Sequence, residues 1–306
     1  MAADIYKDFP SAKETIDECN DILGGGLREM MFKGPHEDLM LTPNAQPAIL
    51  CHSIAILQVL QKEFGFDINS CKYALGHSLG EYSALVATGA LSFKNALKLV
   101  RLRGIAMQSC VTDTQTSMRA LVVAKGYLAN VEQEMLEIQK SMPKGEVAQI
   151  ANINSRSQIV LSGTLKGVEY AETVLQLKGY AGRSLALPVS APFHCSLMTP
   201  ATNVLGPALE EVSFCQPKVD VIANVTAKPV GFKSVCMMDY AHTSKPSCVL
   251  LNQVTQTVQW EKSVRYAKEV GGVSNWIVMG PLRVLSNLLR KDYPKNTIRC
   301  DDSHSA

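Results

Sequence analysis

Apolar residues along the chain recur at the spacings of helices and short strands. Residues 5–23 repeat at helical spacing up to the glycines at 24–26, which predicts an opening helix. Residues 46–64 are apolar nearly all round, so we expect a buried helix there. A short apolar run at 73–75 ends in glycine, as a buried strand does, and helical spacing resumes at 81–90. The first third of the chain therefore predicts helices around one short strand.

The middle of the chain predicts a separate unit. After a helix at about 92–110, the order strand, helix, strand, strand, helix, strand matches the ferredoxin-like motif. We therefore predict a small ferredoxin-like domain at 117–187, inserted into a larger α/β domain formed by 1–116 and 188–306. The predicted elements of the insert are strands at 120–123, 149–154, 159–163 and 183–188 and helices at 129–140 and 167–178.

Composition narrows the class of protein. The 306 residues are 46% apolar and hold 30 basic and 28 acidic side chains, so the chain lacks the strong positive field of a nucleic-acid binder. The sequence contains no uninterrupted run of about 18 apolar residues, so no membrane-spanning helix is predicted. Nine cysteines without metal-binding or CxxC spacing indicate reduced thiols in an intracellular compartment and no metal site. The acidic, amphipathic first residues do not resemble a targeting segment.

The segment Gly76-His77-Ser78-Leu79-Gly80 is a G-x-S-x-G motif between a predicted strand and a predicted helix. In that context a serine sits on a sharp turn with its hydroxyl exposed. We expect a side chain at either glycine to crowd the turn. The N–H of Leu79, at the start of the helix, can donate to an oxyanion. The bare motif also occurs as a simple turn, but its surroundings favour Ser78 as a nucleophile.

A serine nucleophile needs a base, and histidine is the side chain suited to that near neutral pH. His52 lies in the predicted buried helix. His77 neighbours Ser78, but adjacent residues on a sharp turn point apart, so we expect it at the pocket mouth. His194 follows a predicted strand, and the prolines before it restrict its backbone. It is the candidate base, with a structural turn as the alternative. The remaining histidines lie in polar loops or the tail: His36, His242 and His304.

Arg103 is the candidate for substrate selection. It falls on the flank of the apolar face of its predicted helix, whereas Lys94, Lys98 and Arg101 lie on the polar side. Those three side chains indicate a solvated face, with a docking patch for an acidic protein as the lesser alternative. A guanidinium at the edge of a buried face needs a partner, and its planar fork suits a carboxylate. That carboxylate could belong to a substrate or to the protein itself.

Together these segments resemble the malonyl-CoA:acyl carrier protein transacylases of type II fatty acid synthesis over nearly the whole chain. GHSLGEYSALVATGALSF, with RLRGIAMQ downstream, is similar to the family's nucleophile turn and carboxylate-binding arginine. LPVSAPFHCSLMTPA is similar to its catalytic-histidine segment, TVQWEKSV to its Pro-Val-Gln-Trp segment, and QPAIL to the start of its second helix. The combination is more specific than any one motif.

The resemblance implies an α/β-hydrolase-like large domain with a ferredoxin-like insert, and a Ser-His dyad. Ser78 would be the nucleophile, His194 the base, and Gln259 the source of a carbonyl oxygen that orients the imidazole. Arg103 would hold the free carboxylate of malonate. The resemblance also implies that Phe193 leaves little room for a C2 methyl group, and that Asn154 lies near the pantetheine.

The implied activity is malonyl transfer from malonyl-CoA to the phosphopantetheine thiol of acyl carrier protein, through a malonyl ester on Ser78. No metal or redox cofactor is implied, and we expect a monomer with no nucleic-acid or membrane partner. The alternatives are a serine thioesterase or esterase and a truncated, inactive homologue. Similarity to organellar members favours the mitochondrial matrix, with the bacterial cytoplasm as the alternative.

Three features depart from the family. Its members begin with a strand leading to Phe-Pro-Gly-Gln-Gly, whose glutamine completes the oxyanion hole, and this sequence starts after that point. We therefore expect a central strand and one oxyanion donor to be missing. Leu282 stands where a second glycine is usual. The segment 228–248 is longer than in compact bacterial members, and we expect a surface loop without a catalytic role.

Overall fold

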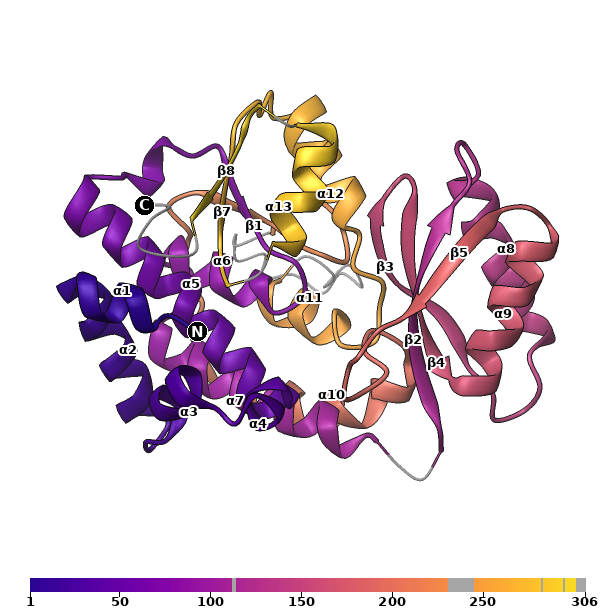
Figure 1. Cartoon of the computed structure of the whole chain (residues 1–306), viewed down its shortest axis with the longest axis horizontal. Coiled ribbons are helices and arrows are strands. Elements are labelled where there is room, and N and C mark those ends of the chain that lie inside the picture. The colour runs from indigo at the N-terminus through magenta and orange to yellow at the C-terminus, as the bar shows by residue number, and fades with distance from the viewer. Residues whose placement is uncertain (112–113, 231–244, 282, 294, 301–306) are drawn as a thin grey trace, which may run out of the picture.

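The computed structural model describes residues 1–306 except 112–113, 231–244, 282, 294 and 301–306 (Figure 1). The expectations for His242, His304, Leu282 and most of the loop at 228–248 lie outside the described residues. The architecture is mixed α/β, as predicted. No described helix is long and apolar enough to cross a membrane.

Helices dominate the first third of the chain. The opening segment forms two helices, α1 (Ala3–Asp8) and α2 (Pro10–Ile22), so the prediction of one helix is wrong. The break falls at Phe9, which is extended with φ −127° because the ring of the following proline disfavours helical backbone there. The chain continues through α3 (Leu27–Lys33), α4 (His36–Met40) and the long helix α5 (Thr42–Phe64).

The main core packs around α5, which is buried along most of its length as predicted. It lies against α2 and against α7 (Phe93–Ser109). The strand β1 (Tyr73–Leu75) pairs in parallel with β6 (Asp220–Ile222), and α6 (Gly80–Ala87) follows β1 directly. Thus β1 ends where α5, α6 and α7 meet, and this position holds the site described below.

The last third of the chain adds helices to the main core and forms a second hydrophobic cluster that contains Trp260 and Trp276. A second parallel pair consists of β7 (Trp276–Met279) and β8 (Thr297–Cys300). Among the described residues the two parallel pairs form separate sheets. The helices of this part are α10 (Thr199–Glu211), α11 (Pro246–Asn252), α12 (Trp260–Glu269) and α13 (Val284–Asp292).

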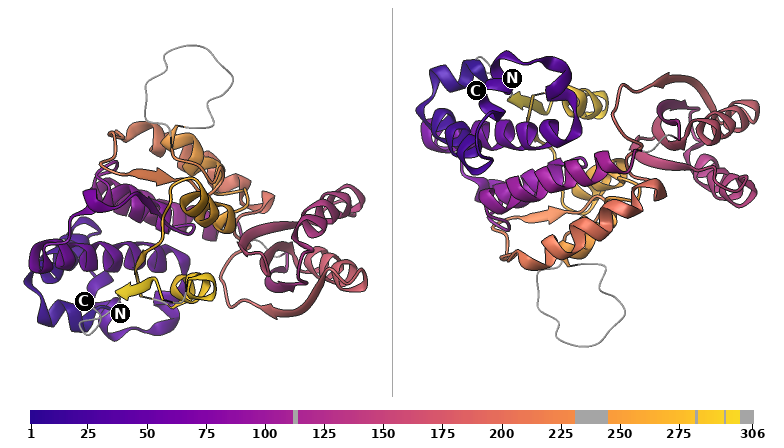
Figure 2. Two further views of the ribbon diagram at one scale, coloured as in Figure 1. Left: turned by 90° about the horizontal axis from the view of Figure 1, so that it is seen from above. Right: turned by 90° about the horizontal axis from the view of Figure 1, so that it is seen from below.

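A four-stranded antiparallel sheet forms the other end of the molecule, opposite the N-terminal helices (Figures 1 and 2). Its strands lie in the order β3-β4-β2-β5, which is the ferredoxin-like arrangement expected from the sequence. The boundaries at 117 and 187 remain a prediction. The elements are β2 (Thr116–Val123), α8 (Leu128–Ser141), β3 (Ala148–Ser155), β4 (Gln158–Thr164), α9 (Leu165–Leu177) and β5 (Ala181–Ala186).

The two faces of this sheet have different partners. Alternate residues such as Ile159 and Leu161 point to α8 and α9, which cover one face. Val160, between them, belongs to a small cluster on the other face that includes the partly buried Phe193. Backbone hydrogen bonds of 2.8 and 3.0 Å also join Val258 to β3. The sheet is therefore anchored to the segments that approach the end of β1.

Candidate active site

Ser78 lies on a sharp turn between β1 and α6, as the motif predicted. Its φ is +53°, a left-handed conformation that non-glycine residues rarely adopt. A Cβ atom on Gly76 would lie 2.0 Å from the backbone oxygen of Gly80, so only glycine fits there. A Cβ on Gly80 would meet nothing within 4 Å. The expected crowding is therefore confirmed for Gly76 and wrong for Gly80.

The side chain of Asn224, buried just after β6, fixes this turn. Its Nδ2 donates to the Gly76 carbonyl at 2.6 Å, and its Oδ1 accepts from the Ser78 N–H at 2.6 Å. One amide therefore holds the backbone on both sides of His77. Asn224 could not be predicted from the sequence, because no local motif connects it to a turn 146 residues away.

The imidazole of His194 lies beside Ser78, so the predicted pair is brought together. Its Nε2 is 2.8 Å from the Ser78 Oγ, and its Nδ1 is 2.7 Å from the backbone oxygen of Gln253. A carbonyl oxygen only accepts, so Nδ1 bears the proton and Nε2 is free to accept the serine proton. Burial and then the charge of Arg103 lower the pKa of His194 to about 3. The ring is therefore neutral near pH 7 and able to act as a base.

The residue that orients this imidazole is Gln253, and the expectation of Gln259 is wrong. Gln259 is the N-cap of α12, so its carbonyl oxygen accepts from the N–H of Ser263 at 2.9 Å. Its own N–H donates to the backbone oxygen of Asn224 at 2.8 Å. Gln253 instead caps the end of α11, where its carbonyl oxygen faces His194.

Arg103 is buried, with 2% of its surface exposed, and its guanidinium reaches the serine. Its Nη2 donates to the Ser78 Oγ at 3.1 Å and to the Gln253 Oε1 at 2.9 Å, and its Nη1 donates to the Gln46 Oε1 at 2.7 Å. Among the described residues, none of the ion pairs involves Arg103. The guanidinium is thus a buried cation whose direct partners are neutral, and it remains able to bind an external carboxylate.

The N–H of Leu79 has no acceptor among the described residues. It stands at the N-cap of α6, next to the serine, where a donor can face an oxyanion. Its part in stabilising such an oxyanion remains a prediction. Within the described ranges, no cluster of three or more His, Cys, Asp or Glu side chains is placed to hold a metal ion.

His77 points away from the Ser78–His194 pair. Its Nε2 lies 2.9 Å from the Oδ1 of Asn154 on β3, and its ring lies near Trp260 with centroids 5.7 Å apart. Burial lowers its pKa. Phe193 contacts both the main core and the small cluster beneath the four-stranded sheet. His77 and Phe193, the sequence neighbours of Ser78 and His194, therefore connect the Ser78–His194 pair to the four-stranded sheet.

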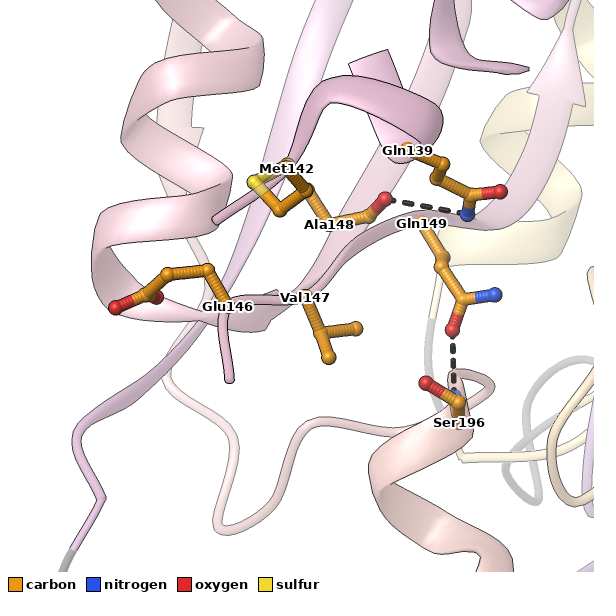
Figure 3. A pocket seen from close by; sticks show the side chains of 7 residues that line it. All are labelled: Gln139, Met142, Glu146, Val147, Ala148, Gln149 and Ser196. Atoms are coloured by element: carbon orange, nitrogen blue, oxygen red, sulfur yellow. Dashed lines mark hydrogen bonds between the residues drawn. The ribbon is translucent and has the colours of Figure 1, made fainter. Parts of the chain in front are cut away.

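A pocket near this site lies at the start of β3 and is shown in Figure 3. Its volume is about 180 Å³, and the Gln149 Oε1 accepts from the Ser196 N–H across it at 2.6 Å. Ser196 is only two residues from His194, but neither Ser78, His194 nor Arg103 lines the pocket. The pocket is therefore separate from the serine.

A hydroxyl on a sharp strand-to-helix turn, hydrogen-bonded to a neutral and carbonyl-oriented imidazole, defines a serine-dependent acyl-transferring site. The model of the acyl transferase domain family matches residues 1–270. The chain therefore belongs to this family, and the resemblance found in the sequence is confirmed.

Within the acyl transferase domain family, the chain is similar to malonyl transacylases. The malonyl CoA-acyl carrier protein transacylase of Bacillus subtilis (strain 168) is 39% identical over 292 residues, which cover 95% of this chain and 85% of the relative. The structure of MCAT from Streptococcus pneumoniae has a TM-score of 0.87 at 33% identity and covers all of this chain and 92% of its own. The structure of a type II PKS acyl-carrier protein in complex with its malonyl-transacylase has a TM-score of 0.84 at 33% identity. The match covers 100% of this chain and 92% of the solved chain.

Proposed function

We propose that this chain transfers a malonyl group from malonyl-CoA to the phosphopantetheine thiol of an acyl carrier protein, as a step of fatty acid synthesis. The observation that carries the proposal is the buried Arg103 guanidinium 3.1 Å from the Ser78 hydroxyl. Ser78 and His194 alone suit many acyl groups. The cation selects acyl groups that end in a carboxylate, and the names of the relatives agree with that selection.

In the first half-reaction the Ser78 Oγ attacks the thioester carbonyl carbon of malonyl-CoA, and its proton moves to the Nε2 of His194. The Leu79 N–H donates to the resulting oxyanion. The carbon–sulfur bond then breaks, and the proton passes from His194 to the departing CoA sulfur. A malonyl ester remains on Ser78. Throughout, the Nδ1–H of His194 stays bonded to the Gln253 carbonyl, which stabilises the transient positive ring.

The second half-reaction runs in the opposite direction with a new thiol. The phosphopantetheine thiol of the carrier gives its proton to His194 and attacks the ester carbonyl. The carbon–oxygen bond breaks, and the Ser78 oxygen recovers a proton from His194. Because CoA leaves before the carrier reacts, the kinetics are ping-pong.

Arg103 exchanges partners when the malonyl group is bound. Before the malonyl group binds, its guanidinium donates to two neutral amide oxygens and to the serine hydroxyl. A carboxylate accepts hydrogen bonds more strongly than any of these. An acetyl group offers no such acceptor. We assign to Phe193, beside His194, the restriction of space at the C2 carbon, since its ring fills the junction between the core and the sheet.

The bond between His77 and Asn154 supports a place for the pantetheine arm at the junction with β3. The solved complex of a related malonyl-transacylase with its carrier protein supports the same partner class. In this account residues 117–187 act as a small domain that covers one side of the substrate path.

For the compartment we keep the mitochondrial matrix as the first proposal and the bacterial cytoplasm as the alternative. The first depends on the long loop at 228–248, of which 231–244 lie outside the described residues. The relatives named above from B. subtilis and S. pneumoniae are bacterial, which supports the alternative. Fractionation of the cells that produce the protein, with an antibody against this chain, separates the two.

Transfer is tested by following the label of radiolabelled malonyl-CoA in the presence of carrier protein. The expected result is label on the carrier that bears phosphopantetheine, and none on the matched carrier lacking it. Release of free malonate at the same rate with either carrier would instead identify a thioesterase.

A further inference from the structure

Glu81 is a buried acidic residue to which the proposed reaction assigns no role. It lies on α6, three residues after Ser78, and none of its surface is exposed. Its Oε2 accepts from the Nε2 of Gln253 at 2.7 Å and from the backbone N–H of Asn224 at 3.0 Å. The inference drawn from it rests on the proposed function and concerns the same site.

The Gln253 side chain stands between Glu81 and Arg103. Its Nε2 donates to the Glu81 carboxylate, while its Oε1 accepts from the Arg103 Nη2 at 2.9 Å. The Nε2 also donates to the backbone oxygen of Ser78 at 3.0 Å, and the Gln253 carbonyl orients His194 at 2.7 Å. One residue, held by Glu81, therefore touches the base, the cation and the backbone of the nucleophile.

Asn224 is the second residue that Glu81 holds. Its backbone N–H donates to Glu81, and its side chain fixes Gly76 and the N–H of Ser78. The left-handed backbone of Ser78 is sparsely populated in isolation, so its surroundings must enforce it. Through Asn224, the carboxylate contributes to that enforcement.

We propose that Glu81 is a positioning residue, whose carboxylate fixes Gln253 and Asn224 and gives Arg103 a counter-charge across the Gln253 amide. A carboxylate in direct contact would form a fork-to-fork pair with Arg103 and exclude the malonyl carboxylate. An uncompensated buried cation would be strongly destabilising. A carboxylate behind an interposed amide avoids both, because the Glu81 charge offsets that of Arg103 while the Gln253 amide keeps the guanidinium open to substrate.

The second Glu81 oxygen supports a role beyond packing. Its Oε1 has no hydrogen-bond partner among the described residues, although the side chain is fully buried. Buried polar atoms are nearly always paired, so a carboxylate with one bare oxygen is an expensive way to build a core. An apolar side chain serving packing alone would avoid the free-energy cost of burying a carboxylate.

Ionisation of Glu81 gives a measurable signature. Burial raises its pKa to about 7, against the opposing effects of Asn224, Gln253 and Arg103. A protonated Glu81 provides no counter-charge, so activity that needs the ionised form is present above about pH 7 and lost as the pH falls through it. The base cannot produce that limb in the free enzyme, because the pKa of His194 is lowered to about 3.

Two titratable neighbours of Glu81 keep their charge state while Glu81 ionises. Arg103 on α7 remains charged and Tyr82 on α6 remains neutral, because burial raises the pKa of that phenol well above its usual range. The elements packed against α6 contribute these further groups: Cys51, His52, Lys62 and Glu63 on α5, Lys94, Lys98 and Arg101 on α7, Tyr73 on β1 and Asp220 on β6.

The test compares Glu81→Gln with the wild type and with Glu37→Gln, a control on the exposed surface of α4. Rapid-quench loading of Ser78 from malonyl-CoA is measured between pH 5.5 and about 8.5. We expect the wild type and the control to show an acid limb in kcat/KM near pH 7. Glu81→Gln should lose this limb and reduce kcat about 10- to 100-fold at pH 8, with KM for malonyl-CoA changed far less.

A Glu81→Gln profile that keeps the limb and the wild-type rate would overturn the role of Glu81. A wild-type kcat/KM that does not change between pH 6 and about 8 would also overturn it. This second measurement does not depend on the folding of a variant. Glu81→Asp, which keeps the charge, should retain the limb at a reduced rate. If the wild type fails to load Ser78 at all, the proposed function is wrong, which is a distinct outcome from loading without a contribution of Glu81.

Discussion

The turn at Ser78 and the four-stranded sheet are held by different kinds of contact. In the sheet, strands of six to eight residues pair along antiparallel ladders that shift register at a few points, and the core comes from residues 121–181. Around Ser78, single polar side chains meet from segments as far as 175 residues apart. The sheet unit is thus stabilised by repeated local pairing, whereas the site depends on a few long-range hydrogen bonds, each of which fixes a reacting group.

Backbone strain is distributed in the same uneven way. Ser78 and His194 both have positive φ, at +53° and +58°, although neither is glycine. Between residues 116 and 186, all of them described, no non-glycine residue does so. Such conformations persist where surrounding contacts enforce them. The polar contacts of the site therefore hold a geometry that the chain would not adopt by itself.

The largest expected effect comes from His194→Ala. Without the imidazole, nothing accepts the serine proton, and we expect kcat to fall about 10³- to 10⁶-fold. Thermal unfolding should show that the variant is still folded. His36→Ala, on the exposed surface of α4, is the matched control and should keep its rate. A loss below about tenfold would show that another group takes the proton.

Replacing Arg103 tests the selection of acid-bearing acyl groups. Arg103→Ala should reduce kcat/KM for malonyl-CoA about 10²- to 10³-fold, because the carboxylate then enters the site without a partner. The rate with acetyl-CoA should fall much less. Arg103→Lys keeps the charge but not the fork, and an intermediate loss is expected. An unchanged preference for malonyl over acetyl groups in Arg103→Ala would reject this role.

Alanine variants at three glycines allow a direct comparison of the Ser78 turn with the four-stranded sheet. Gly76→Ala should destabilise the protein by about 2–4 kcal/mol and abolish Ser78 loading, whereas Gly80→Ala should change stability by less than about 1 kcal/mol. Gly163→Ala places a Cβ 1.9 Å from the Val147 oxygen, so it should also destabilise. Its folded fraction should load Ser78 normally. Equal loss of loading per folded molecule in Gly76→Ala and Gly163→Ala would contradict the difference between the regions.

The smallest expected effect is a change in substrate preference on replacing Phe193, the residue next to His194. Phe193→Leu removes bulk beside His194, and the ratio of methylmalonyl to malonyl transfer should rise about tenfold. Phe214→Leu, another partly buried ring of the main core, should leave this ratio unchanged. The two ratios are measured by competition between the CoA esters. No rise in Phe193→Leu would assign the selection at C2 to another residue.

The same contrast explains how much the sequence could predict. The elements of the small sheet followed from local periodicity, and their order is confirmed. Ser78, His194 and Arg103 stood in recognisable segments. Glu81, Asn224 and the orienting role of Gln253 could not be found this way, because their roles arise only when distant segments meet.

Two errors have specific causes. Gln253 and Gln259 lie six residues apart in one segment, and only the fold decides which carbonyl faces the imidazole. The Gln259 carbonyl accepts a hydrogen bond within the first turn of α12. The apolar periodicity of the sequence did not reveal that this helix begins there. The break between α1 and α2 did have a local signal, since Pro10 restricts Phe9.

In the proposed reaction Ser78 takes up the malonyl group as an ester, in a site prepared by His194 and Arg103. Intact-mass spectrometry of the chain after brief exposure to malonyl-CoA, followed by peptide mapping, tests it most directly. We expect a single malonyl adduct on the peptide containing Ser78, absent from Ser78→Ala and discharged by the thiol of carrier protein. An equal adduct on Ser78→Ala would contradict it, as would carrier loading by a wild type that is never acylated.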